Sequence, residues 1–391
     1  MADTFRLTLA QLNATVGDLA GNAALARKAW EAGREAGADM VALPEMFITG
    51  YNTQDLVMKP AFHQAAIAEV RKLAVDCADG PALGIGGPAL SGAGLYNGYY
   101  ILKNGTISAT VQKHHLPNET VFDEVRIYDN GDIGGPYAVG DVRIGTPICE
   151  DGWHPDVAET LAETGAEFLL IPNGSPYYRG KMETRQNLMV ARAVETGLPV
   201  IYLNLVGGQD DQVFDGGTFA LNPGGELALQ MPVMHEAIAH LDLVRTDAGW
   251  RAEQGELAPI PDAYEQDYHA MVLSLRDYIR KTGFRKVLLG LSGGIDSAIV
   301  ATIATDALGP DNVRCVMLPS EYTSQSSLDD AKAVAENLGC RYDFVPIAEG
   351  RQAITNTLAP LFEGTEEGLT EENIQSRLRG LLLMALSNKF G

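Results

Sequence analysis

Residues 286–309 read KVLLGLSGGIDSAIVATIATDALG, and this stretch decides the fold class. Its first part, Val287–Leu291, is an apolar run of strand length, and Ser297–Leu308 is an alanine-rich segment of helix length. Gly293 and Gly294 lie between them and predict a tight turn. A buried strand that turns directly into a helix is typical of an α/β protein, in which helices cover a sheet.

The same alternation of short apolar runs and amphipathic, alanine-rich segments continues along the rest of the chain, so an α/β fold is predicted throughout. Further strands are predicted at Phe5–Leu9, Met40–Leu43, Leu83–Gly86, Thr110–Lys113, Val142–Ile148, Phe168–Ile171, Val200–Leu203 and Val313–Met317. Further helices are predicted at Asn22–Ala36, Ala61–Asp76, Met182–Thr196, Tyr264–Thr282 and Ser326–Leu338.

The chain has 391 residues, whereas single domains usually have roughly 100–200, so two domains are expected. The stretch Thr246–Asp262 is rich in glycine, proline and charge and has no clear period. The sequence therefore predicts a first domain over residues 1–245, a linker over 246–263 and a second domain over 264–391.

Composition excludes several function classes. Hydrophobic residues make up 46% of the chain and charged residues 20%, the balance of a globular protein with a real core. A net charge of −22 repels phosphate backbones and anionic lipids, so nucleic acid and membranes are not expected as partners, although a local basic pocket can still hold a nucleotide. The opening residues do not have the layout of a signal peptide. The four cysteines have no metal-like or disulfide-like spacing, and a cytoplasmic location is expected.

Three reactive side chains stand at or just beyond the ends of predicted strands: Glu45 in LPEMF, Lys113 in TVQKHHLP and Cys149 in IGTPICEDGW. Strand ends are where α/β folds gather their chemistry. Cysteine can attack an amide carbonyl to form a thioester while ammonia leaves. Glu45 is the candidate base, and Lys113 the candidate cation that stabilises the oxyanion. Glu150 and Asp151, which follow Cys149, would hold the thiol protonated, so both the base and the cation are needed.

Each of these residues also has a simpler interpretation. A cysteine that ends an apolar strand is more often a small buried hydrophobe, and a single lysine or glutamate is usually a surface charge. His114 and His115 raise the alternative of a Cys-His pair, but beside a strand-end lysine we interpret them as loop or supporting residues.

Taken with their flanking residues, the three are more specific. LPE, KHHLPN and PICEDGWHP resemble the nitrilase superfamily, and the resemblance covers about residues 5–242. It implies a four-layer α-β-β-α sandwich, a Glu-Lys-Cys triad and an amide or nitrile substrate. It also implies that Glu124, in VFDEVRIY, is an acidic residue that orients the site. The residues that the resemblance makes candidates for binding glutamine are Glu119, Ser175, Tyr177 and Lys181.

The segment SGGIDS is a candidate phosphate site, because backbone N–H groups of a glycine-rich turn and a helix N-terminus point outward as donors. A plain helix cap would use similar residues. The whole segment, however, resembles the pyrophosphate loop of N-type ATP pyrophosphatases. The candidate ATP-binding residues are Leu291, Ser292, Gly293, Gly294, Asp296 and Ser297, with Asp296 as the candidate Mg²⁺ ligand. The Walker pattern GxxxxGK[ST] does not occur, and GIGGPA from Gly84 lacks the third glycine of a dinucleotide fingerprint.

The order of the two parts is similar to that of glutamine-dependent NAD synthetases. This resemblance implies glutamine as nitrogen donor, ATP with Mg²⁺, and nicotinic acid adenine dinucleotide as the acceptor whose carboxylate is adenylated and then amidated to NAD, releasing AMP and pyrophosphate. It also implies homo-oligomers with channelled ammonia. The family continues beyond Gly391, so we expect an incomplete second domain, a doubly wound parallel sheet in its opening part, and glutaminase activity at most from these 391 residues.

Two other hypotheses remain open at this point. The chain is a stand-alone amide hydrolase whose second part is a docking surface, or it is a non-catalytic nucleotide-sensing module. Broad amide turnover without a response to ATP favours the first, and a Cys149 that is inert toward glutamine analogues favours the second.

Overall fold

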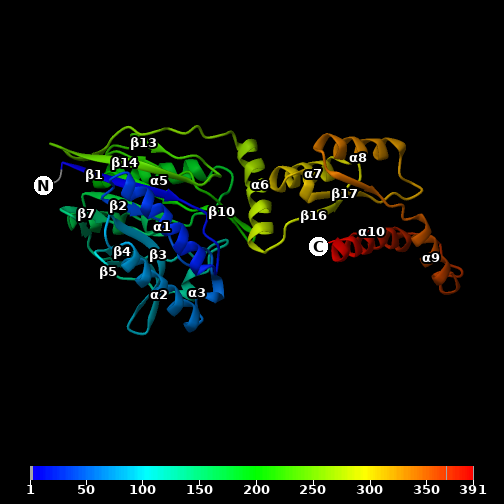
Figure 1. Cartoon of the computed structure of the whole chain (residues 1–391), viewed down its shortest axis with the longest axis horizontal. Coiled ribbons are helices and arrows are strands. Elements are labelled where there is room, and N and C mark those ends of the chain that lie inside the picture. Colours follow the sequence, from blue (N-terminus) through cyan, green and yellow to red (C-terminus); the bar gives the residue numbers. More distant parts are fainter. Residues whose placement is uncertain (1–2, 367, 391) are drawn as a thin grey trace. The chain divides into compact units, whose positions relative to one another are not determined.

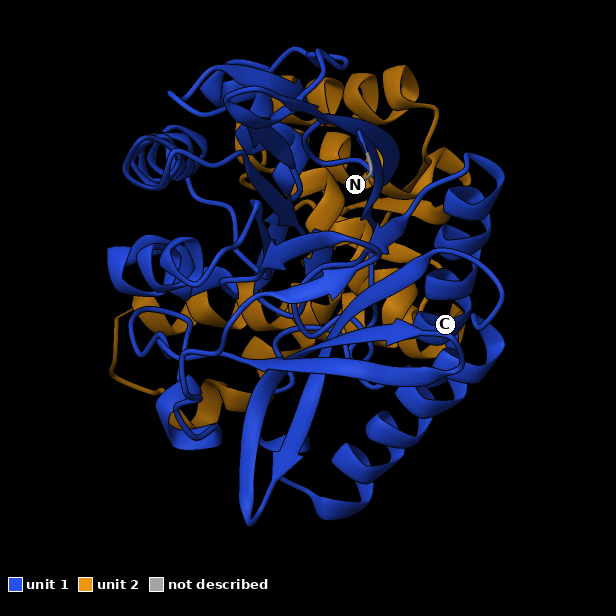
Figure 2. Cartoon of the chain, turned by 90° about the vertical axis from the view of Figure 1, so that its left-hand side faces the viewer, with its two compact units in different colours: residues 1–270 blue, residues 271–391 orange. Residues whose placement is uncertain are grey.

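The structure is a computed structural model that describes residues 3–366 and 368–390 (Figure 1). Gly391, the residue beyond which the family is expected to continue, lies outside the described residues. The chain forms two compact units, residues 1–270 and 271–391 (Figure 2). The division falls within helix α6 (Ala263–Lys281).

The first unit contains two large sheets. The seven-stranded sheet has the order β15-β14-β1-β2-β3-β4-β5, and β1 pairs in parallel with β2 and antiparallel with β14. Its strands are β1 (Thr4–Gln11), β2 (Met40–Ala42), β3 (Ala82–Ser91), β4 (Gly94–Lys103), β5 (Thr106–Gln112), β14 (Ala237–Thr246) and β15 (Gly249–Ala252).

The second sheet of this unit has six strands in the order β13-β12-β9-β8-β7-β6, and β7, β8 and β9 run in parallel. Its strands are β6 (Tyr137–Val139), β7 (Val142–Gly145), β8 (Phe168–Asn173), β9 (Val200–Asn204), β12 (Phe219–Leu221) and β13 (Leu227–Gln230). Strands β10 (Val206–Gln209) and β11 (Gln212–Asp215) form a separate hairpin.

Strands β2, β8 and β9 are buried along their whole length because both of their faces are covered. In β2, Met40 and Ala42 point into the core between the two sheets, whereas Val41 packs on the outer side with Ala26 and Trp30 of α1. Helices α1 (Leu19–Glu35) and α2 (Pro60–Asp76) cover the seven-stranded sheet. Helices α4 (Pro155–Glu163) and α5 (Lys181–Thr196) contact the six-stranded sheet. The predicted four-layer α-β-β-α sandwich is confirmed.

The second unit is built on a parallel sheet, β16-β17-β18. One face packs on α7 and α8 through Cys315 and Met317, and the other packs on α9 and α10 through Val316 and Leu318, so the sheet has helices on both faces as predicted. The elements are β16 (Val287–Gly290), α7 (Ile295–Leu308), β17 (Val313–Met317), α8 (Gln325–Leu338), β18 (Arg341–Phe344), α9 (Ala348–Leu358) and α10 (Leu369–Phe390).

Every predicted strand and helix has a counterpart, but several limits were wrong. The strand predicted at Val142–Ile148 ends at Gly145, because Pro147 has no N–H to donate and the N–H of Ile148 bonds to the Asp151 carboxylate instead. Lys113 follows β5 rather than ending it. The elements that were not predicted include β4, β14 and α4, whose glycines, charges or short length obscure the period.

Residues 249–252 lie in the stretch assigned to a linker, and they form β15, which pairs with β14. The assignment of residues 246–263 to a linker between functional domains stays a prediction. Among residues 3–366 and 368–390, none of the helices has the length and apolar character needed to cross a bilayer.

Gly86 of β3 allows another segment to approach the sheet closely. A Cβ atom at this position would lie 2.1 Å from the backbone nitrogen of Met46 and 2.7 Å from the Cα of Glu45. The N–H of Ile48 also bonds to the carbonyl of Gly86, at 3.1 Å. The GIGGPA motif is therefore explained by packing against residues 45–48.

We predict that Gly86→Ala destabilises the protein by about 1–3 kcal/mol, because backbone atoms of residues 45–46 must move to admit the methyl group. Urea unfolding monitored by circular dichroism measures the change. Gly134→Ala is the matched control, since a Cβ there meets nothing within 4 Å. Equal stability of the two variants would contradict the close-approach argument.

Candidate active site

Lys113 is a fully buried lysine held between two buried carboxylates. Its Nζ lies 2.7 Å from Glu45 Oε1 and 2.7 Å from Glu124 Oε2. Burial alone lowers the pKa of this ammonium, but the charges of Glu124 and Glu45 outweigh burial and raise the pKa well above its usual value. Lys113 is therefore a permanent cation, and three residues that the sequence analysis singled out meet in one place.

Two uncharged side chains complete the cluster, and the sequence analysis missed both. Asn97 of β4 donates its Nδ2 to Glu45 at 2.8 Å and to Glu124 at 2.9 Å, and the hydroxyl of Tyr51 donates to Glu124 at 3.0 Å. The N–H of Gly174 donates to Glu45 Oε2 at 2.7 Å. All of these bonds are donated to the carboxylates, the pattern of ionised acids, although burial raises the pKa of Glu124. No local signal marked Asn97, because it lies beside Gly98 in a segment that reads as a turn.

Cys149 begins a short 3₁₀ helix, η2 (Cys149–Trp153), just after the strand segment ends. Its φ angle is +49°, in the left-handed region that non-glycine residues rarely adopt and that is frequent at active sites. The side chain is 4% exposed. Burial raises the pKa of the thiol well above its usual value, Glu45 raises it further, and Lys113 lowers it. Both charges thus act on the sulfur of the candidate nucleophile.

Asp151 ties the segment that carries Cys149 to the segment that follows Lys113. Its carboxylate accepts the N–H of Ile148 at 3.0 Å and those of His114 and His115 at 3.1 and 2.7 Å. Asp151 is buried, and burial raises its pKa in spite of these donors. The sequence analysis took both acids after Cys149 as groups that hold the thiol protonated. Glu150 does raise the pKa of the thiol, but Asp151 serves the backbone instead.

The segment after β8 carries Ser175, one of the candidate glutamine-binding residues. Ser175 Oγ accepts from Arg185 Nε at 3.1 Å, and Ser175 N–H donates to Asn204 at 2.9 Å. Arg185 is fully buried, and its Nη1 donates to both carboxylate oxygens of Asp215, at 2.8 and 2.9 Å. Ser175 directly follows Gly174, the donor to Glu45. This candidate is therefore held rigidly beside the triad.

Lys181, the second candidate, is also close to the nucleophile's segment. Its Nζ lies 4.1 Å from the ring centre of Trp153, the last residue of η2, and 4.6 Å from that of Tyr178. An ammonium in this position is suited to pair with a substrate carboxylate. Glu119, the remaining acidic candidate, is exposed in the turn before Glu124, and its carbonyl accepts the N–H of Phe122 at 3.0 Å.

Tyr177, the last of the glutamine-binding candidates, is anchored on helix α6. Its hydroxyl donates to Asp267 Oδ1 at 2.7 Å, and Arg179 pairs with the other oxygen of the same carboxylate. The hydrogen bond from Arg179 is the largest cause of the lowered pKa of Asp267. The loop that carries Ser175 and Tyr177 is thus held by Arg185 and by Asp267.

The second candidate site is the turn between β16 and α7. Ser292 and Ser297 hydroxyls lie 3.0 Å apart, and Ser297 donates to the carbonyl of Gly294 at 2.9 Å, so the two serines brace the turn. Gly293 has a φ of +83°, and a Cβ there would lie 2.3 Å from the carbonyl oxygen of Ser327. Asp296 is exposed in the first turn of α7. The helix N-terminus, the serine hydroxyls and the exposed carboxylate of Asp296 suit a phosphate with its cation.

A cavity of about 280 Å³ adjoins this turn at the carboxyl ends of β16 and β17. Leu291 and Ser292 line it on one side, and Met317, Thr323 and Arg379 line it on the other. Arg379 was not singled out from the sequence. Ligands of open α/β sheets bind at this edge, so the cavity and the turn form one candidate nucleotide site.

Comparison with known proteins identifies a family for each of the two parts of the chain. Residues 6–250 match the carbon-nitrogen hydrolase family, and residues 267–391 match the NAD synthase family. The glutamine-dependent NAD(+) synthetase of Rhodobacter capsulatus is 59% identical over 391 residues, which cover all of this chain and 71% of that protein. The chain belongs to the glutamine-dependent NAD(+) synthetases. It is a ligase of NAD biosynthesis, and the two alternatives of an isolated amidase and a non-catalytic module are not supported.

Solved structures agree with this membership of the glutamine-dependent NAD(+) synthetases. The synthetase of Acinetobacter baumannii, solved in complex with ADP, matches with a TM-score of 0.93 and 34% identity over 99% of this chain and 73% of that chain. A mutant amidase from Nesterenkonia, described with the acetamide moiety of fluoroacetamide added at its active-site cysteine, matches with a TM-score of 0.55 and 25% identity over 61% of this chain and 90% of that chain.

We predict that alkylation of Cys149 by iodoacetamide is slow near neutral pH and rises about tenfold per pH unit, because burial and Glu45 hold the thiol protonated. Mass spectrometry of the peptide containing Cys149 measures the rate at each pH. The Cys149→Ala protein reports background labelling of the other cysteines. A rate that levels off below about pH 8 would show instead that Lys113 maintains a thiolate.

Proposed function

We propose that residues 1–245 release ammonia from glutamine with Cys149 as nucleophile, Glu45 as base and Lys113 as oxyanion-stabilising cation. The observation that carries this proposal is the buried ion pair of Lys113 and Glu45, whose charges both act on the Cys149 thiol. A protonated thiol needs a base within reach before it can attack. Glu45 is held as a carboxylate by three donors and meets this need.

The reaction then has two halves. Glu45 takes the thiol proton as the sulfur attacks the side-chain carbonyl of glutamine, and the negative oxygen that develops is stabilised by Lys113. The amide nitrogen accepts a proton from Glu45 and leaves as ammonia, so a γ-glutamyl thioester remains on Cys149. Glu45 next activates a water molecule, which cleaves the thioester to glutamate. Glu124 keeps Lys113 in position throughout, since it holds the same ammonium at 2.7 Å.

Residues 264–391 contribute the turn at 291–297 to an ATP site. ATP adenylates the carboxylate of nicotinic acid adenine dinucleotide and releases pyrophosphate, and ammonia then displaces AMP to give NAD. Ser292, Gly293, Gly294 and Ser297 offer hydroxyl and N–H donors to the phosphates, beside Leu291 in the cavity. Asp296 offers a hard oxygen ligand, so the residues present fit Mg²⁺, which takes one or two carboxylates together with phosphate oxygens. The ion would neutralise phosphate charge.

Glutamine is bound, in this proposal, by the loop after β8. Lys181 supplies a cation for the α-carboxylate, Ser175 supplies a hydroxyl, and Tyr177 lines the rim, while Glu119 supplies a carboxylate for the α-ammonium group. The division into domains 1–245 and 264–391 joined by residues 246–263, a cytoplasmic location, and a homo-oligomer with channelled ammonia complete the proposal. The limits of the two family matches support that division.

We predict that Cys149→Ala lowers ammonia release from glutamine by ~1000-fold or more, because the nucleophile is lost. Release is followed in a coupled ammonia assay with and without Mg-ATP and the acid dinucleotide. In any form of the protein that makes NAD from ammonium, the same variant retains the ammonium-supported rate. Loss of both activities in a folded variant would refute the divided mechanism.

We also predict that Asp267→Ala raises the KM for glutamine about fivefold, the equivalent of roughly 1 kcal/mol, with little change in kcat. The reason is that Tyr177 and Arg179 lose the carboxylate that fixes their loop. Glu265→Ala is the matched control, because Glu265 is an exposed acid on the same helix. An unchanged KM in the Asp267 variant, or an equal rise in both, would show that the anchor does not act on the substrate loop.

A further inference from the structure

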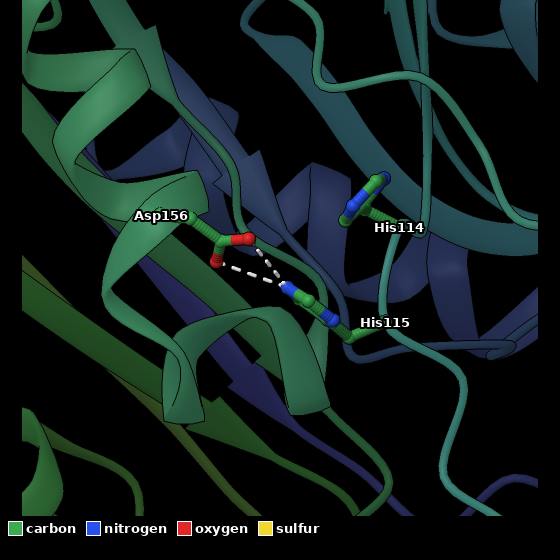
Figure 3. Close-up of side chains that lie close together, drawn as sticks. All are labelled: His114, His115 and Asp156. Carbon is green, nitrogen blue, oxygen red and sulfur yellow. Dashed lines mark hydrogen bonds and ion pairs between the residues drawn. The ribbon is translucent and has the colours of Figure 1, made fainter.

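Three side chains outside the proposed reaction meet on the surface of the first unit: His114, His115 and Asp156 (Figure 3). Each offers one ligand atom, and these atoms all lie within 4.8 Å of one another. His115 Nε2 lies 2.9 and 3.0 Å from the two carboxylate oxygens of Asp156. The three come from two separate segments, the one that follows β5 and the first turn of α4.

The buried carboxylate of Asp151 explains why two consecutive histidines gather here. Successive side chains of a strand point to opposite sides. Asp151 Oδ1 accepts the N–H of both His114 and His115, which turns the backbone at this point. The two rings then lie edge to face with their centres 4.7 Å apart. The arrangement is therefore fixed by a buried group rather than by chance meeting of flexible side chains.

The tautomer of His114 is fixed in the form that suits a ligand. His114 Nδ1 lies 2.7 Å from the carbonyl oxygen of Gly131, and only a protonated ring nitrogen can donate to a carbonyl. In the neutral ring, Nε2 therefore carries a lone pair. A histidine that donates one nitrogen to a backbone carbonyl and presents the other is the usual arrangement of metal-bound histidines.

A simpler account covers only part of the cluster. The contact between His115 and Asp156 is an ordinary ion pair when His115 is protonated, and Asp156 also accepts the N–H of Val157 at 2.9 Å in the first turn of α4. This account gives no role to His114, which offers a ring nitrogen to the same group of atoms.

We propose that His114, His115 and Asp156 form a binding site for a divalent transition metal of the zinc class. Two imidazole nitrogens with one carboxylate favour such ions over Mg²⁺ or Ca²⁺, which take oxygen ligands. Neighbouring ligands of a tetrahedral zinc site lie roughly 3.3 Å apart, given bonds of about 2.0 Å. The His115–Asp156 spacing of 2.9 Å is therefore close to what an inserted ion needs, and water supplies the fourth ligand.

The proposed metal site lies between the segment that follows Lys113 and the segment that follows Cys149. His114 directly follows Lys113, and Asp156 lies on α4 just after η2, the element that begins with Cys149. A bound ion cross-links these two segments. It stabilises the folded protein because the unfolded chain does not hold the three ligands together.

The test is zinc titration calorimetry on the Cys149→Ala protein, so that the active-site thiol cannot bind the metal, in buffer with excess Mg²⁺. We expect one zinc ion per chain. We expect binding at least ~10-fold weaker in each of His114→Gln, His115→Gln and Asp156→Asn, and unchanged binding in His269→Gln, a histidine outside the group. Visible absorption of bound Co²⁺ reports tetrahedral geometry, and thermal unfolding reports a zinc-dependent rise in Tm that His115→Gln lacks.

Several results would overturn the proposal. These are no zinc binding to the Cys149→Ala protein, a stoichiometry unaffected by the three ligand variants, or equal weakening in His269→Gln. Circular dichroism shows whether each variant is folded. If one variant does not fold, the Co²⁺ spectrum of the Cys149→Ala protein, which keeps both histidines, decides the question.

Discussion

The burial of one ammonium between two carboxylates is the constraint on which the first unit depends. Lys113, Glu45 and Glu124 are almost completely inaccessible to solvent, and an unpaired charge in such a place is very costly. The structure offsets this cost with hydrogen bonds from Asn97, Tyr51 and a backbone N–H. Because these donors come from different strands and loops of both sheets, the two sheets must pack in one register for the charges to be satisfied.

The same constraint gives the site its chemical character. A cation that cannot lose its proton is available to stabilise a developing oxyanion, whereas a carboxylate beside it can exchange protons with sulfur, nitrogen and water. Asp151 extends this organisation to the backbone, since it joins the segment after Lys113 to the segment of Cys149. Positioning of the reacting groups is thus shared between buried ion pairs and one buried carboxylate that touches none of the reacting atoms.

The sequence predicted the fold class, and the buried residues that meet in the candidate site, better than it predicted the groups that hold them. Glu45, Lys113 and Cys149 were recognisable because they stand at strand ends within distinctive flanking residues. Asn97 was not, because GLYNGYY resembles a turn more than a buried strand. Asp267 and Arg379 were not either, since their roles depend on which helix face meets a distant loop, and no local pattern reports that. The predicted end of a strand was wrong where a side chain takes the place of a backbone hydrogen-bond partner, as the Asp151 carboxylate does for the N–H of Ile148.

The 4% exposure of Cys149 also bears on how the enzyme survives oxidants. Peroxides and disulfides react with thiolates that they can reach, and this sulfur is both protonated and enclosed. Glutathione disulfide is far bulkier than a carboxamide group, so a sulfur with 4% exposure is poorly placed to react with it. In the proposed mechanism, this burial also shields the nucleophile from irreversible oxidation between turnovers.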